Sequence, residues 1–205
     1  MACVGLLTRD DILRELAAFP IHTRRDESHP EDDVLFRRLL GNRFDALPAA
    51  VRTVHGGCGP AVFSGRAIVR AGRSLPARVM RHLLGLPRSG RHDVTVTLAP
   101  DARGETWTRR FGGARFTSRL VDTDRMAVFE ERVGPLRVAF DLRPQARGVV
   151  WQMVGWRLLG LPLPRQLAPR MRARAEDVDG SYRFRVVVSH AWIGLLFAYR
   201  GMLVP

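Results

Sequence analysis

The feature that most constrains this chain is a run of nine short strand-like segments from residue 92 onward, with no helical segment between them. They cover residues 92–99, 105–111, 115–121, 125–133, 136–143, 148–159, 170–176, 181–190 and 194–204. Turn-forming pairs such as Gly112-Gly113, Gly134-Pro135 and Asp179-Gly180 separate several of them. Because a parallel α/β sheet needs helices between its strands, this order indicates antiparallel pairing.

A large antiparallel sheet exposes edges that pair with other chains unless it curls or closes. We therefore expect a mainly β (α+β) fold, a curved antiparallel sheet that forms a lipocalin-like barrel or half-barrel of about nine strands. Two to three helices should flank it, at 34–40, 44–55 and 74–87, with a further strand at 63–72. Residues 161–169 hold three prolines, which predicts a rigid crossing loop.

The chain divides at about residue 33. Residues 9–19 show helical spacing of apolar side chains, and residues 20–33 are charged, with two prolines. We expect residues 1–33 to form an N-terminal helix and a flexible linker. Residues 34–205 should form the barrel domain with an internal pocket.

A formal charge of +13 would ordinarily suggest a nucleic-acid partner. However, all 33 basic residues are Arg, with no Lys and a single Asn, a bias typical of a GC-rich genome. We therefore expect no nucleic-acid binding. Two cysteines without a pairing motif, no signal peptide and an apolar run of only about 15 residues predict a soluble cytoplasmic protein without a membrane span.

Alternation along each strand sorts the side chains into two faces. The apolar faces hold Trp107, Arg109 and Phe111; Phe116 and Ser118; Met126, Val128 and Glu130; Phe140; and Tyr182 and His190. Because a buried charge is costly unless paired, we expect Arg109 and Glu130 to pair inside the barrel. The alternative is that this pair only satisfies itself, that Ser118 is a small packing residue, and that His190 is solvent-exposed.

Common cofactor and metal motifs are missing from the sequence. It has no GxGxxG, P-loop, GxSxG or HExxH, and its six histidines lack the spacing of metal ligands. The absence of Lys excludes Schiff-base chemistry within this chain. We expect neither a cofactor nor a metal, so any catalysis would be acid–base chemistry.

Several segments across residues 34–205 have a recognisable pattern, among them LPAAVRTVHG (47–56), ETWTRRFGGARFTSRL (105–120), FEERVGPLRVAF (129–140) and WRLLGLPLPRQLAPR (156–170). These segments carry a resemblance to the bacterial domain of unknown function 4166 family. It implies that the family's polar positions map onto His55, Trp107, Arg109, Ser118 and Glu130. It also implies a protein that acts alone or beside a separate NAD(P)-dependent reductase, because members look like stand-alone proteins or partners of such domains.

These observations favour a cofactor-independent cyclase, isomerase or dehydratase that acts on a lipophilic or polyketide-like substrate. Glu130 would be the acid/base, Arg109 would hold a carboxylate or enolate, and His55 or His190 would transfer a second proton. The residues expected to contact substrate are Trp107, Phe111, Phe116, Ser118, Phe140, Tyr182 and Tyr199. Two alternatives stay open: a non-catalytic carrier of lipophilic ligands, and a membrane-surface protein that uses its arginines and the Trp151, Trp156 and Trp192 region. A homodimer is also left open.

Overall fold

The computed structural model describes residues 34–162 and 164–204, so the helix and linker predicted within residues 1–33 lie outside the described residues. The strands are β1 (Ala61–Ala71), β2 (Gly90–Asp101), β3 (Gly104–Phe111), β4 (Ala114–Asp122), β5 (Val128–Val133), β6 (Leu136–Gln145), β7 (Gly148–Leu158), β8 (Leu161–Pro162), β9 (Arg170–Val178), β10 (Ser181–His190) and β11 (Gly194–Val204). The helices are α2 (Leu35–Leu40), α3 (Ala49–His55) and α4 (Leu75–Leu83), with 3-10 turns at Gly41–Arg43 and Arg165–Leu167.

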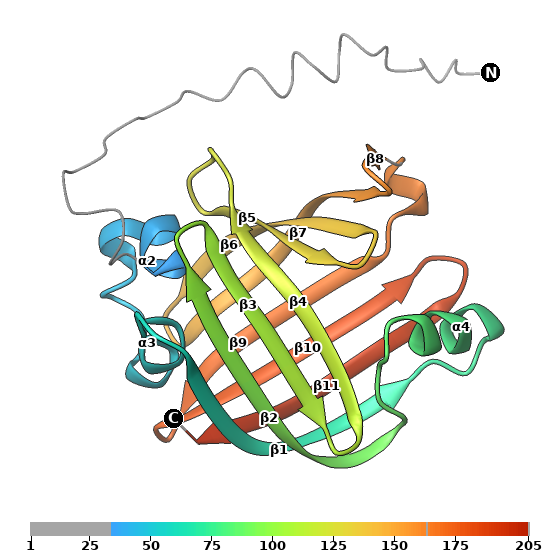
Figure 1. Cartoon of the computed structure of the whole chain (residues 1–205), viewed down its shortest axis with the longest axis horizontal. Coiled ribbons are helices and arrows are strands. Elements are labelled where there is room, and N and C mark those ends of the chain that lie inside the picture. Colours follow the sequence, from blue (N-terminus) through green and yellow to red (C-terminus); the bar gives the residue numbers. More distant parts are fainter. Residues whose placement is uncertain (1–33, 163, 205) are drawn as a thin grey trace, which may run out of the picture.

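The strands form a closed antiparallel barrel (Figure 1). Their order is β6-β5-β4-β3-β2-β1-β11-β10-β9-β7, and pairing of β7 with β6 closes the ring at ten strands. Strand β8 pairs only with the end of β7. The mainly β fold and the barrel are thus confirmed, and closure gives each of the ten strands a neighbour on both sides. Within the stretch predicted as a crossing loop, β8 and a 3-10 turn interrupt the irregular chain.

Helices α2 and α3 cover one end of the barrel, called here the closed end (Figure 1). Their apolar side chains, including Phe36 and Val51, are fully buried. The Ala50 N–H donates to Asp177 Oδ2 at 2.9 Å, which ties the start of α3 to the end of β9. Because the first N–H groups of a helix have no acceptor within it, this bond also satisfies one of them.

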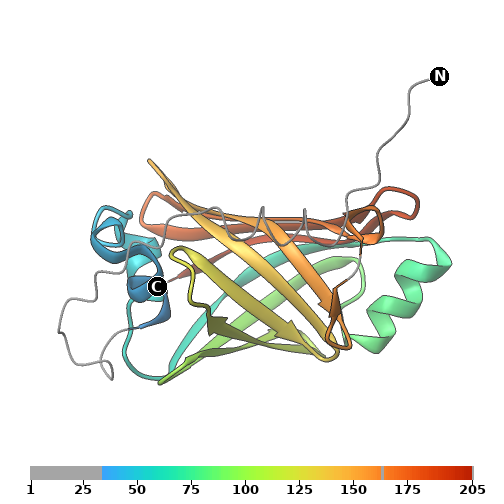
Figure 2. The ribbon, with the colours of Figure 1, turned by 90° about the horizontal axis from the view of Figure 1, so that it is seen from above.

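Helix α4 lies at the other end of the barrel, where it contacts β1 and β11 (Figure 2). A Cβ on Gly72 would meet Ala77 Cβ at 2.7 Å and Leu195 O at 1.9 Å, so the close approach requires glycine. Some apolar side chains of β6, β9 and β10, among them Leu136, Met171 and Val186, are only partly buried. The side chains of α2 and α3 are therefore more completely buried than these strand side chains.

Candidate functional site

A buried arginine on β3 is the centre of the polar interior. Arg109 Nη1 donates to Ser118 Oγ at 2.9 Å, and its Nη2 lies 3.5 Å from Glu131 Oε1. The two charged side chains are 6% and 8% exposed. The guanidinium also lies over the rings of Trp107, at 4.7 Å, and Phe116, at 5.3 Å. The structure thus brings Trp107, Arg109 and Ser118 together inside the barrel, with Phe116 against the guanidinium.

The predicted partner of this arginine is wrong by one residue. Glu131 pairs across the sheet with Leu120 and Val138, both buried, so it faces inward. Glu130 faces the outside, where Arg132 Nε donates to its Oε1 at 2.7 Å. Alternation failed here because Val128 and Phe129 are both buried, and the preceding turn packs on α2 through the Ala127 N–H to Leu39 O bond. Met126, assigned to the same inward face, is exposed.

A column of stacked groups runs from the closed end toward the middle of the barrel. The Phe36 and His55 rings stack at 3.9 Å, and the His55 and Trp107 rings follow at 5.4 Å. Arg109 and Phe116 continue the column beyond Trp107. The last residue of α3, His55, therefore packs inside the barrel against Trp107, which in turn contacts Arg109.

His55 is bound to the barrel wall through Tyr182. Its Nε2 lies 2.9 Å from the Tyr182 hydroxyl, and Nδ1 has no hydrogen-bond partner among the described residues. Burial, helped by the charge of Arg109, lowers the pKa of His55 to about 3, so the imidazole is neutral near pH 7. Burial also raises the pKa of Tyr182 and of Tyr199, so both phenols keep their protons.

Glu105 is a site residue that the sequence interpretation missed. It lies two residues before Trp107 on the same face of β3 and is buried. Burial raises its pKa to about 7, against the opposing positive charges of Arg109 and Arg38. Neither Glu105 Oε1 nor Trp107 Nε1 has a hydrogen-bond partner in the described part of the chain. Alternation alone would have found it, because Glu105 shares the inward face of β3 with Trp107.

A small cavity of about 40 Å³ adjoins Arg109. Its walls include Trp107, Trp151, Tyr182 and Tyr199, together with aliphatic side chains of β2, β9 and β10. A cavity needs roughly 10–15 Å³ of this volume to hold one water molecule, so this cavity has room for a few waters. A lipophilic ligand would need the partly buried wall side chains, such as Phe184 and Val186, to move. The cavity therefore has polar chemistry but little open volume.

The remaining predicted residues are spread over the barrel. Phe111 packs on Tyr199 at 5.4 Å and lines the cavity. Phe140 stacks on Phe129 at 5.4 Å, and neither ring lines the cavity. His190 ends β10, where its ring contacts that of Trp192 at 5.5 Å. It is therefore not brought to Arg109 with the others.

Comparison with known proteins identifies a family but no individual protein or solved structure that matches. The family described as domain of unknown function (DUF4166) matches residues 47–203. No curated protein matches the chain. No solved structure matches it either. Within residues 34–162 and 164–204, no three metal-ligating side chains lie together, and no helix has the length and apolar character to cross a bilayer.

Proposed function

We propose a function for this chain, which belongs to the DUF4166 family, a family whose description assigns no activity. The barrel binds a small lipophilic molecule, and the Arg109 guanidinium donates hydrogen bonds to an oxygen atom of that molecule. The observation that carries this proposal is the buried Arg109 guanidinium on the wall of an otherwise mostly apolar cavity. Such a pocket, with a few convergent polar groups, is the usual form of a small-molecule site.

The groups at this cavity favour an oxygen acceptor. Arg109 has five N–H donors, and two of its nitrogens have partners among the described residues. The Tyr199 phenol keeps its proton, because burial raises its pKa, and it lines the same cavity. A carbonyl, carboxylate or enolate oxygen would accept from these donors, while the ligand's apolar part would contact Trp107, Trp151 and the aliphatic walls.

A pair of fluorescent probes that differ by one charge tests this proposal. We expect 1-anilinonaphthalene-8-sulfonate to bind at one site and about tenfold tighter than uncharged 1-anilinonaphthalene, because the guanidinium contacts the sulfonate. In Arg109→Met/Glu131→Gln, which removes both charges together, the two affinities should become equal. The matched control is Arg110→Met on the outer face of β3. A preference unchanged in the double variant, or no saturable binding of either probe, would refute the proposal.

Acid–base catalysis at the same site is the second candidate, favoured by the pKa of about 7 at Glu105. It ranks second because Glu105 does not line the cavity, so a proton would have to pass beside Trp107. In this reaction the Glu105 carboxylate would take an α-proton of a ketone while the enolate oxygen accepts hydrogen bonds from Arg109. The Glu105 carboxyl group would then exchange its proton with solvent and return a proton, or in D2O a deuteron, to the carbon. Deuterium exchange into 2-decanone, followed by NMR, tests it: exchange should require Glu105 and disappear in Glu105→Gln.

A further inference from the structure

Helix α4 exposes a stripe of apolar side chains, beside the exposed Arg78 and His82. Leu75, Val79 and Leu83 lie four residues apart, so they form one stripe along the helix. Leu75 is 71% and Leu83 76% exposed, whereas Ala77 is buried against the barrel. A surface helix normally buries its apolar side and turns its polar side to water. Helix α4 instead exposes a second set of apolar side chains to solvent, in addition to those that pack on the barrel.

Other apolar side chains are exposed at the same end of the barrel. Leu159 and Leu161 lie at the β7–β8 turn, and Trp192, 74% exposed, lies in the β10–β11 turn. Figures 1 and 2 both place these turns and α4 at the end away from α2 and α3. Three separate segments thus present large apolar side chains around one end, called here the α4 end.

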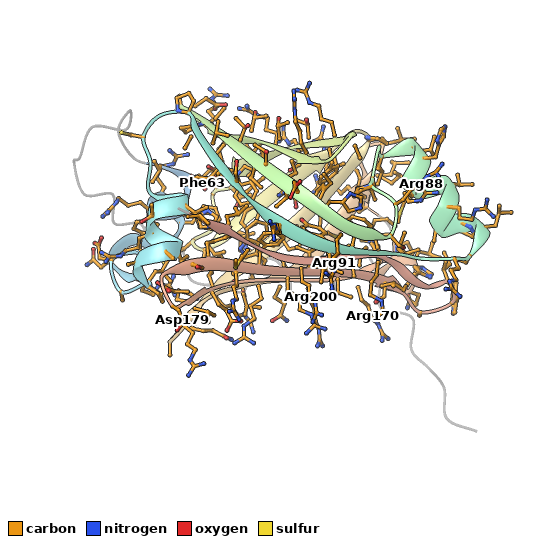
Figure 3. All side chains as sticks on the ribbon, turned by 90° about the horizontal axis from the view of Figure 1, so that it is seen from below. Phe63, Arg88, Arg91, Arg170, Asp179 and Arg200 are labelled. Atoms are coloured by element: carbon orange, nitrogen blue, oxygen red, sulfur yellow. The ribbon has the colours of Figure 1, made fainter. Side chains whose placement is uncertain are left out.

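The acidic side chains are distributed unequally between the two ends of the barrel. The five connections at the α4 end, residues 72–89, 112–113, 134–135, 159–169 and 191–193, hold no Asp or Glu. Exposed arginines there are Arg73, Arg78, Arg88, Arg91, Arg157 and Arg170, and the exposed Asp93 lies near Arg91 on β2. Figure 3 shows Arg88 and Arg170 at this end and Asp179 at the closed end. The α4 end therefore combines a positive rim with exposed apolar side chains.

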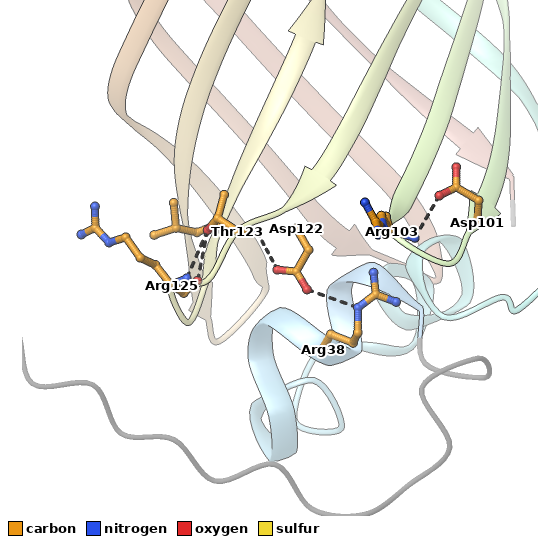
Figure 4. Close-up of polar contacts among 7 residues, drawn as sticks. Arg38, Asp101, Arg103, Asp122, Thr123 and Arg125 are labelled. Atoms are coloured by element: carbon orange, nitrogen blue, oxygen red, sulfur yellow. Dashed lines mark hydrogen bonds and ion pairs between the residues drawn. The ribbon is translucent and has the colours of Figure 1, made fainter. Parts of the chain in front are cut away.

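Acidic side chains gather instead at the closed end. Asp101 and Asp122 end β2 and β4, and Asp124 and Asp179 follow in the turns there. Several are paired: Arg38 of α2 reaches Asp122 at 3.3 Å, and Asp101 accepts the Arg103 N–H at 3.0 Å (Figure 4). Because the acidic side chains are concentrated at the closed end, an excess of arginine spread evenly over the chain does not account for the positive charge of the α4 end.

We propose that the α4 end docks on the surface of an anionic lipid bilayer. Leu75, Leu83 and Trp192 would enter the interfacial region, where tryptophan and amphipathic helices partition. The arginine rim would lie against anionic headgroups, which attract clustered basic residues. Charge complementarity favours this occupant over an uncharged apolar partner. The proposal goes beyond the proposed function and does not depend on it, because a barrel that binds no ligand would dock equally well.

Co-sedimentation of the full chain with phosphatidylcholine vesicles, with and without phosphatidylglycerol, tests the proposal at low salt. We expect binding to the anionic vesicles that weakens as salt rises. Leu75→Ser/Leu83→Ser should lower the partition coefficient about tenfold or more, because two exposed leucines are lost from the interface. The control is Met126→Ser, a side chain 71% exposed at the closed end, which should bind as the wild type does.

A second pair of variants separates the contribution of charge. Arg78→Gln/Arg88→Gln should weaken binding to the anionic vesicles severalfold, whereas Arg103→Gln at the closed end should not. No binding to anionic vesicles at low salt would overturn the proposal. Binding that the α4-end variants leave unchanged, or that both ends weaken equally, would overturn it as well. Circular dichroism of each variant would show that the barrel remains folded.

Discussion

Arg109 of β3 and Glu131 of β5 pair across the intervening strand β4, with 3.5 Å between Nη2 and Oε1, inside a barrel wall that is otherwise mostly apolar. Removing one partner leaves the other as an uncompensated buried charge. We therefore expect Arg109→Met to lower the free energy of unfolding by about 3–5 kcal/mol, measured by urea denaturation.

Removing both charges together tests whether the instability of Arg109→Met comes from the unpaired Glu131. Arg109→Met/Glu131→Gln should cost less than Arg109→Met alone, because no unpaired charge remains buried. A double variant at least as unstable as the single variant would show that the pair is not the main electrostatic contact of either residue. The exposed control, Arg110→Met, should change stability by about 0.5 kcal/mol or less.

His55 should make the barrel sensitive to acid. Its pKa is about 3 in the folded protein and near 6.5 in the unfolded chain, so the unfolded state takes up the proton first as pH falls. The contribution of His55 to the free energy of unfolding should fall below pH 6.5, by about 1.4 kcal/mol per pH unit, and Glu105 opposes this fall down to about pH 4.5. His55→Phe keeps a ring between Phe36 and Trp107 and should remove this dependence. A variant with the same slope as the wild type would contradict the assignment.

Glu105 should act in the opposite direction. Its pKa rises from 4.5 to about 7 on folding, so the unfolded chain ionises first as pH rises, and the contribution of Glu105 to stability falls between these values by about 3 kcal/mol. Glu105→Gln should remove that fall and leave a steeper loss toward acid from His55. Denaturation at several pH values between pH 4 and 8 measures both effects, and an unchanged profile would contradict a buried, perturbed carboxyl.

Glu130 should be dispensable despite its motif position. Its pair with Arg132 lies on the outer face, and such exposed pairs contribute about 0–1 kcal/mol. Glu130→Gln should therefore leave stability within that range and probe binding unchanged. Loss of binding in this variant would contradict the side-chain orientation described above.

Much of the interior could be predicted from alternation within single strands. Trp107, Arg109 and Phe111 are inward because β3 is regular and its apolar residues lie on one face. Tyr182 follows the same rule on β10. The barrel itself followed from the number of strands and the absence of helices between them, because a large sheet must protect its edges.

The partners across the barrel could not be predicted in this way. Which glutamate meets Arg109 depends on where β5 begins, and a shift of one residue exchanges the faces. Burial of both Val128 and Phe129 hid that start. The contact of His55 with Tyr182 joins residues 127 positions apart, so it depends on how α3 closes the barrel rather than on any local pattern.

The central claim is that ligand binds inside the barrel beside Arg109, and the indole N–H signals of the four tryptophans test it most directly. Trp107 and Trp151 line the cavity, whereas Trp192 is exposed at the α4 end. In ¹⁵N-labelled protein titrated with 1-anilinonaphthalene-8-sulfonate, the Trp107 and Trp151 signals should shift and that of Trp192 should not. Shifts confined to Trp192, or none at all, would contradict an interior site.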